Sequence, residues 1–176
     1  MCIVLGTARV DAHQLANVLE ELHFSADMPR EVLEQLAAAS ALRRLTAGEV
    51  VFREGTRHGN LYLVRSGRIA LEMNVPGRGA VCILTVGPGE MVGWSALLDR
   101  GKMTASAVAV DDSEVVVAPA DNLRELSETN RDFGFHLMRQ MAAALSKRLV
   151  ATRLQLLDLF TDSPPPIPAS TPETAE

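Results

Sequence analysis

Residues 45–73, LTAGEVVFREGTRHGNLYLVRSGRIALEM, carry the clearest signal of the fold class. This stretch consists of short runs rich in β-branched, aromatic and leucine residues, and glycines separate these runs. Runs of this length with turn residues between them are typical of antiparallel strands joined by tight turns. The same pattern continues as far as residue 120. Residues 48–120 are therefore predicted to form an antiparallel sandwich or barrel.

Helical patterns flank this region on both sides. In residues 10–45, apolar side chains recur three and four positions apart, which predicts helices there. Inside the strand region, EMVGWSALL (90–98) lacks alternation and predicts a short helical turn. A long helix is predicted from about residue 130 to residue 160, because no proline and, after Gly134, no glycine interrupts it.

The predicted long helix carries a regular apolar seam. Its members are spaced alternately four and three residues apart, which is the a/d pattern of a coiled coil. The pattern predicts a homodimer through this face, and packing against the chain's own barrel is the alternative. The predicted interface residues are Met138, Ala142, Leu145, Leu149, Thr152, Leu156 and Leu159.

Composition narrows the classes of function. The net charge of −5 gives no general affinity for nucleic acid, so direct DNA binding is not expected. Cys2 and Cys82 form no CxxC pair, so neither a zinc site nor a disulfide framework is expected. The apolar start MCIVLG is too short for a signal peptide or a membrane span, which predicts a cytoplasmic protein without membrane contact. The proline-rich residues 161–176 are predicted to be disordered.

Two motifs of catalysis or cofactor binding are incomplete. Ser95 in GWSAL resembles the G-x-S-x-G elbow of hydrolases, but Leu97 stands where the second glycine is needed. The four histidines are dispersed, with no spacing typical of metal ligands. A lone His136 on the long helix could hold a haem iron, but a packing or surface role is favoured. The sequence therefore predicts a protein that is not an enzyme and requires no metal.

The order of these elements resembles the cyclic nucleotide-binding domain family, the regulatory domain of the catabolite activator protein and of cyclic-nucleotide-dependent kinases. Residues 45–73, VGPGEMVGWSALL (86–98) and TASAVAVDDSEVVVAPA (104–120) carry the resemblance. It covers about residues 28–160. It implies a β jelly roll, preceded by an N-terminal helical segment (1–27) and closed by a dimerising C-terminal helix (130–160). The helix-turn-helix domain of the family's transcription factors is not expected within these 176 residues.

The family's ligand loop is a phosphate-binding cassette. A short helix offers backbone N–H groups to the cyclic phosphate, an arginine pairs with the phosphate, and a glutamate binds the ribose. By resemblance, Trp94 stands at the glutamate position, and Met103, or Thr104, at the arginine position. The resemblance thus implies a degenerate cassette that binds a cyclic nucleotide weakly, or another small ligand. The implied ligand-binding residues are Gly93, Trp94, Ser95, Ala96, Leu97, Met103, Thr104, Ala105, Ser106 and, on the long helix, Thr152.

Two functions fit these patterns. The first is a ligand-responsive regulatory module that dimerises through its long helix. The second is a ligand-free adaptor or accessory subunit, whose pocket is filled by Trp94 and whose surface docks on a partner protein. Arg100 and Lys102 could replace one phosphate contact, but solvated surface charges are the favoured interpretation.

Overall fold

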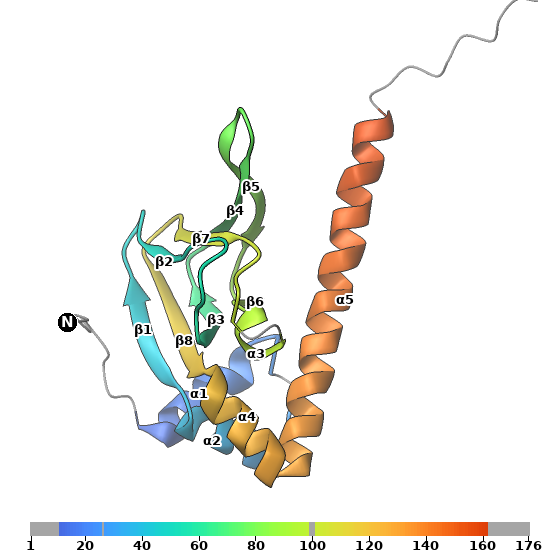
Figure 1. The fold of residues 1–176 in the computed structure, drawn as a ribbon. Helices are drawn as coiled ribbons and strands as arrows, with labels where there is room; N and C mark the ends of the chain where they lie inside the picture. The colour runs from blue at the N-terminus through green and yellow to red at the C-terminus, as the bar shows by residue number, and fades with distance from the viewer. Residues whose placement is uncertain (1–10, 26, 99–100, 162–176) are drawn as a thin grey trace, which may run out of the picture. The chain divides into compact units, whose positions relative to one another are not determined.

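Two four-stranded antiparallel sheets form the centre of the molecule (Figure 1). The computed structural model describes residues 11–25, 27–98 and 101–161, with side chains described up to residue 157. One sheet has the strand order β1-β8-β3-β6 and the other β2-β7-β4-β5. The strands are β1 (Ala41–Leu45), β2 (Val50–Phe52), β3 (Asn60–Ser66), β4 (Ile69–Val75), β5 (Gly79–Val86), β6 (Met91–Val92), β7 (Ser106–Ala109) and β8 (Ser113–Pro119). This arrangement confirms the predicted jelly roll.

The helices are α1 (Ala12–Glu21), α2 (Arg30–Ala38), α3 (Ser95–Leu98), α4 (Ala120–Thr129) and α5 (Arg131–Thr161). Figure 1 shows α1, α2 and α4 gathered at one end of the two sheets. The predicted long helix is confirmed as α5. The proline-rich segment 162–176 and residues 1–10, on which other predictions were made, lie outside the described residues.

The prediction of helix throughout residues 10–45 is wrong at its end. Ala41–Leu45 forms β1, which pairs antiparallel with β8, so that Leu42 lies opposite Val116. Leu42 and Leu45 are both buried, and their spacing of three positions fits a helix as well as a strand. The pairing with β8, which is remote in sequence, decides between the two.

The prediction of a helical turn over residues 90–98 is confirmed in part. Ser95–Leu98 forms α3, but Met91–Val92 forms the short strand β6, which pairs with Leu63 and Tyr62 of β3. Met91 and Val92 are both buried, as expected for a strand covered on both faces. The ligand loop predicted by resemblance therefore begins at the end of a strand and continues into a helix.

One turn of the jelly roll can be made only by glycine. Gly67, between β3 and β4, has a φ of +81°, a conformation that other residues rarely adopt. A Cβ atom there would lie 2.1 Å from the Ser113 Oγ atom of β8. The turn between β3 and β4 thus packs directly on β8.

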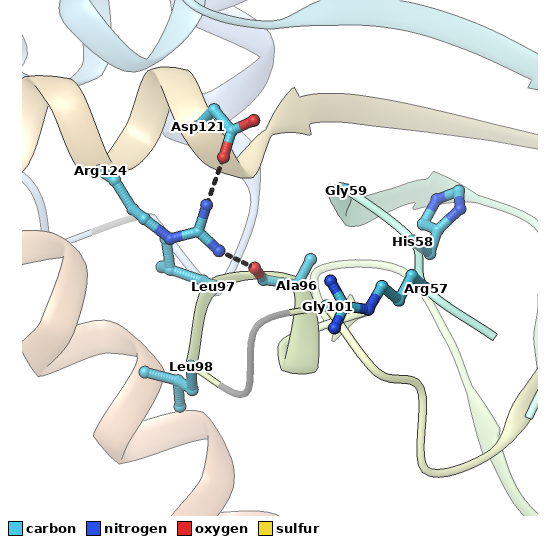
Figure 2. A pocket seen from close by; sticks show the side chains of 9 residues that line it. All are labelled: Arg57, His58, Gly59, Ala96, Leu97, Leu98, Gly101, Asp121 and Arg124. Carbon is cyan, nitrogen blue, oxygen red and sulfur yellow. Dashed lines mark hydrogen bonds and ion pairs between the residues drawn. The ribbon is translucent and has the colours of Figure 1, made fainter. Parts of the chain in front are cut away.

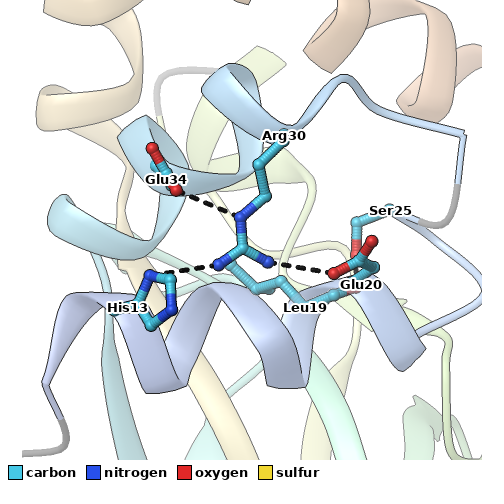
Figure 3. Close-up of polar contacts among 6 residues, drawn as sticks. All are labelled: His13, Leu19, Glu20, Ser25, Arg30 and Glu34. Atoms are coloured by element: carbon cyan, nitrogen blue, oxygen red, sulfur yellow. Dashed lines mark hydrogen bonds and ion pairs between the residues drawn. The ribbon is translucent and has the colours of Figure 1, made fainter.

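An arginine clamps the two N-terminal helices together (Figure 3). The Arg30 guanidinium of α2 pairs with Glu20 of α1 at 2.9 Å and with Glu34 of α2 at 3.1 Å, and it lies 3.2 Å from the His13 Nδ1 atom. These groups are largely exposed, so each contact adds little to the free energy of unfolding. Most of the stability of this pair comes from the buried leucines between the helices, which include Leu19 and Leu33.

Helix α5 belongs to two compact units. The first unit ends at Ala144, and within it Phe133, Leu137 and Met141 of α5 are buried. The second unit begins at Leu145 and contains the rest of the helix. In this second unit the large apolar side chains Leu149, Val150, Leu154, Leu156 and Leu157 are all exposed. Within the described part of the chain, no helix is long and apolar enough to cross a membrane.

Candidate functional site

The segment that links β6 to α3 is held by a close backbone contact. Gly93 has a φ of +81°, and a Cβ atom there would lie 2.7 Å from the Asn60 carbonyl oxygen. It would also lie within 3.5 Å of the aromatic rings of Phe52 and Tyr62. Both the conformation and the space therefore require glycine, and the chain enters α3 at a fixed angle.

Helix α3 is a single turn with its own hydrogen bonds. The Ala96 N–H donates to the Gly93 carbonyl at 2.9 Å, and the Leu97 N–H donates to the Trp94 carbonyl at 3.0 Å. After the helix, the Gly101 N–H donates to the Ser95 carbonyl at 3.0 Å, which closes the loop on itself. Ser95, Ala96 and Leu97 are buried. The short helix is thus fixed by the main chain.

The returning segment is bound to the turn between β2 and β3. The Met103 N–H donates to the Thr56 carbonyl at 3.0 Å, and the Gly55 N–H donates to the Met103 carbonyl at 2.8 Å. The His58 N–H donates to the Gly101 carbonyl at 2.8 Å. None of these bonds uses a side chain. Any residue other than proline at position 103 can therefore form these bonds.

The structure places nine of the ten predicted ligand-binding residues, Gly93–Leu97 and Met103–Ser106, on this one loop. The Met103 side chain is 2% exposed, whereas Trp94 is half-buried and Thr104 is exposed. The Ser106 Oγ atom accepts a hydrogen bond from the Glu54 N–H at 3.0 Å. Arg100 lies outside the described residues, and Lys102 is exposed.

The tenth predicted residue, Thr152, belongs to the second unit, where its hydroxyl donates to the Arg148 carbonyl at 3.0 Å. In the predicted seam, Met138, Leu149 and Leu156 are 39%, 52% and 51% exposed. The other described members are exposed, apart from the half-buried Leu145, and the side chain of Leu159 is not among those described.

An aromatic cluster lies beneath the loop. Tyr62 is fully buried, and its hydroxyl lies 2.7 Å from the His58 Nε2 atom. The His58 and Tyr62 rings stack with centroids 5.6 Å apart, and the Phe52 ring completes the cluster. Burial lowers the pKa of His58, and the positive charge of Arg43 lowers it further. Burial also raises the pKa of Tyr62. Both groups are therefore uncharged at neutral pH.

A hollow of about 480 Å³ adjoins α3 (Figure 2). It is lined by the turn 57–59, by α3 residues Ala96–Leu98, by Gly101, and by Asp121 and Arg124 of α4. The Arg124 guanidinium donates to the Asp121 carboxylate and to the Ala96 carbonyl. No sequence motif marks Arg57, His58 or Arg124 as site residues, because Arg124 is far from Arg57 and His58 in the chain. Among the described residues, no cluster of three His, Cys, Asp or Glu side chains could hold a metal ion.

Comparison with known proteins gives the relatives of this chain. The family model of the cyclic nucleotide-binding domain matches residues 42–130. A cyclic AMP receptor protein of Thermus thermophilus is 40% identical over 89 residues, which are 50% of this chain and 40% of that protein. Glutaminase 2 of Bradyrhizobium diazoefficiens is 26% identical over 147 residues, 80% of this chain and 22% of that enzyme. This chain thus spans less than half the length of either relative.

Comparison with solved structures also finds cyclic nucleotide-binding domains. The crystal structure of a cyclic nucleotide-binding domain from Methylobacillus flagellatus superposes with a TM-score of 0.74 at 20% identity, covering 88% of this chain and 86% of that one. At this identity the likeness concerns the fold alone. The glutaminase indicates that a domain of this kind also occurs in a chain named as an enzyme. Domains of this kind are regulatory and not catalytic.

Proposed function

The chain belongs to the cyclic nucleotide-binding domain family, and on this premise we propose that it is a homodimeric regulatory module with a degenerate phosphate-binding cassette. Its cassette binds a cyclic nucleotide weakly, or another small ligand in the same place. The 40% identity to a protein named as a cyclic AMP receptor supports cyclic AMP as the first ligand to test.

The observation that carries this proposal is the main-chain framework of the loop. Gly93, the turn of α3 and the bonds between residues 101–103 and 55–58 hold most of the loop through main-chain atoms, and Arg124 of α4 adds one side-chain bond to the Ala96 carbonyl. A short helix of this kind can still present backbone N–H groups to an anion. However, Met103 cannot pair with a phosphate, and the Trp94 indole can only donate a hydrogen bond. Losing two charge-assisted contacts weakens binding by roughly two to four decades.

The dimer is supported by the exposed apolar face of α5. Leu149 and Leu156 are about half exposed, although they recur at a/d spacing with Met138 and Leu145. A continuous apolar stripe of this length is unusual on a monomer and is normally covered by a partner. A second copy of the same chain supplies a matching stripe, because an a/d seam is complementary to itself.

A titration with cyclic AMP and cyclic GMP tests the cassette. Trp94 is the only tryptophan, so its fluorescence reports on the loop without a label, and calorimetry gives the stoichiometry. The expected dissociation constant is on the order of tens of micromolar or weaker. Saturation below micromolar concentration would contradict the loss of the two charged contacts.

The second candidate is a ligand-free adaptor that docks on a partner protein. Two observations favour it: the Met103 side chain is buried where the family's arginine is expected, and the Trp94 indole is half-buried in the same loop. A loop filled by these two side chains has less room for a nucleotide. No heat and no fluorescence change up to millimolar nucleotide would favour this function over the first.

A further inference from the structure

The hollow beside α3 has the dimensions of a small-molecule site. Its volume of about 480 Å³ lies within the range of known ligand pockets. Three segments that are remote in sequence form it: the turn that follows β2, the end of α3, and the start of α4 (Figure 2). Of the predicted cassette residues, only Ala96 and Leu97 line it, so it is a different space from the proposed nucleotide site.

The chemistry of the hollow favours an anion with an apolar body. Arg57 forms no ion pair or side-chain hydrogen bond with any described residue, so its guanidinium is available to a ligand. The second guanidinium of the wall belongs to Arg124. Among the described residues it pairs with one carboxylate, that of the highly exposed Asp121. Leu97 and the half-exposed Leu98 supply an apolar surface beside the two cations. Guanidinium groups bind phosphate and carboxylate oxygens through paired hydrogen bonds.

Arg124 also connects the hollow to the cassette. Its guanidinium donates to the Ala96 carbonyl of α3, while the Ala96 N–H donates to Gly93, the entry to the cassette. An anion that binds Arg124 competes with this carbonyl for the same donor. Binding in the hollow therefore changes how firmly α4 holds α3, which starts directly after Trp94.

We propose that this hollow is a second ligand site for a small organic phosphate or carboxylate, which is bound by Arg57 and Arg124 and alters the cassette through the bond from Arg124 to Ala96. The proposed binding depends only on the structure of the hollow, whereas the proposed effect on the cassette also depends on the proposed regulatory function. A ligand in one site then changes the affinity of the other, and by linkage the effect is reciprocal.

Binding is tested by calorimetry on the full chain at low ionic strength, with phenyl phosphate, inorganic phosphate, benzoate and acetate as probes. The aromatic probes are expected to saturate and to bind more tightly than their inorganic or short-chain counterparts, because of the Leu97–Leu98 wall. The relative affinities of phenyl phosphate and benzoate show whether the site prefers a phosphate or a carboxylate group. Failure of both to saturate by about 10 mM would overturn the site.

Substitutions locate the binding. Arg57→Gln and Arg124→Gln are each expected to weaken the aromatic probe by about tenfold or more, since each removes a charge-assisted contact. Arg78→Gln, in the exposed turn between β4 and β5, is the matched control and is expected to leave binding unchanged. If Arg124→Gln does not fold, the exposed Arg57→Gln decides alone. Unchanged binding in the arginine variants that fold would overturn the proposal.

The effect on the cassette is tested through Trp94. In the wild type, the probe is expected to change the Trp94 emission with the same midpoint as the heat signal. In Arg57→Gln the change returns at higher concentration, whereas in Arg124→Gln it is lost even at saturation. A wild type that binds the probe without any change at Trp94 would refute the coupling.

Competition separates the two sites. If cyclic AMP binds, the probe and the nucleotide are expected to bind together, each shifting the other's midpoint. Mutual exclusion would place the probe in the cassette and overturn the second site. If neither cyclic AMP nor cyclic GMP binds, the proposal of a nucleotide in the cassette fails, while the calorimetric result for the hollow is a separate test of the second site.

Discussion

The cassette loop and the second half of α5 differ in what holds their structure. Residues 93–98 and 101–103 are held mostly by hydrogen bonds between main-chain atoms, by the close approach of Gly93 to Asn60, and by the bond from Arg124 to the Ala96 carbonyl. Residues 145–157 form regular helix, but their large apolar side chains are exposed in the single chain. The first region is expected to keep its main-chain structure when functional side chains are replaced. The second region exposes apolar side chains that no other part of its own unit covers.

Substitutions are therefore expected to act differently in the two regions. In the loop, replacing a side chain such as Met103 is expected to change ligand binding and to preserve the main-chain hydrogen bonds. Replacing Gly93 is expected to disrupt the main-chain conformation itself. In α5 the helix survives most substitutions, because it needs only local hydrogen bonds, and a change at Leu149 alters association instead. The four predictions below test this division, from the largest expected effect to the smallest.

A charge in the seam is expected to have the largest effect. Leu149→Lys places an unpaired charge in the proposed interface of both copies and is expected to dissociate the dimer. Light scattering is expected to give about 38 kDa for the wild type, twice the 19.0 kDa of the chain, and about 19 kDa for the variant. The truncation Leu149→Ala is expected to cost about 2–5 kcal/mol per copy if the side chain is fully buried in the dimer.

Val150→Lys is the matched control for this prediction. Val150 is as exposed as Leu149, at 52%, but does not belong to the seam, so its variant is expected to remain dimeric. A wild type that is monomeric at micromolar concentration would refute the dimer, and equal dissociation of both variants would refute this choice of interface.

A Cβ atom at Gly93 is expected to destabilise the loop framework. Gly93→Ala combines a positive φ with a contact of 2.7 Å to the Asn60 carbonyl, whereas Gly77→Ala has a similar φ of +79° and open space. We expect a loss of about 1 kcal/mol for Gly77→Ala and of about 3 kcal/mol or more for Gly93→Ala. Denaturant titration measures both. Equal losses would show that the close contact relaxes and does not constrain the loop.

An arginine in the cassette is expected to restore nucleotide affinity. If position 103 is the family's arginine position, Met103→Arg strengthens cyclic AMP binding by roughly 10- to 100-fold, through one charge-assisted contact. Thr104→Arg tests the other alignment of the loop. Met73→Arg, on the exposed β4 position, controls for added positive charge. A gain in none of the three, with the fold intact, would favour the ligand-free adaptor.

The smallest effect is a dependence of stability on pH at His58. Burial and Arg43 lower its pKa in the folded state below the ordinary value of 6.5, so the unfolded chain binds the proton more readily. The free energy of unfolding is therefore highest above pH 6.5 and falls as the pH drops through 6.5 toward the folded pKa. The effect is modest, because His58 is only half-buried.

Denaturant titrations between pH 7.5 and pH 5 measure this slope. His58→Gln is expected to flatten it while retaining a polar partner for Tyr62. An identical slope in the wild type and in His58→Gln would assign the pH dependence to other groups.

Local pattern alone determined much of this protein. Glycines between short β-branched runs predicted an antiparallel sandwich or barrel, because turn chemistry and strand propensity depend on residues adjacent in sequence. The jelly roll was implied by the family resemblance. The uninterrupted run after Gly134 predicted α5, and the a/d spacing predicted the face that the structure leaves exposed. The lack of alternation around Ser95 predicted α3, since a helical turn needs no partner remote in sequence.

Only the tertiary structure decided features that join distant residues. Residues 41–45 became a strand because β8 offers them a pairing edge, which overrides a spacing equally suited to a helix. The need for glycine at position 93 follows from the Asn60 carbonyl, which lies against it from another strand. Arg57 and Arg124 line one hollow because α4 packs beside α3. Such contacts depend on how the strands and helices pack in three dimensions, and residue spacing along the chain does not predict them.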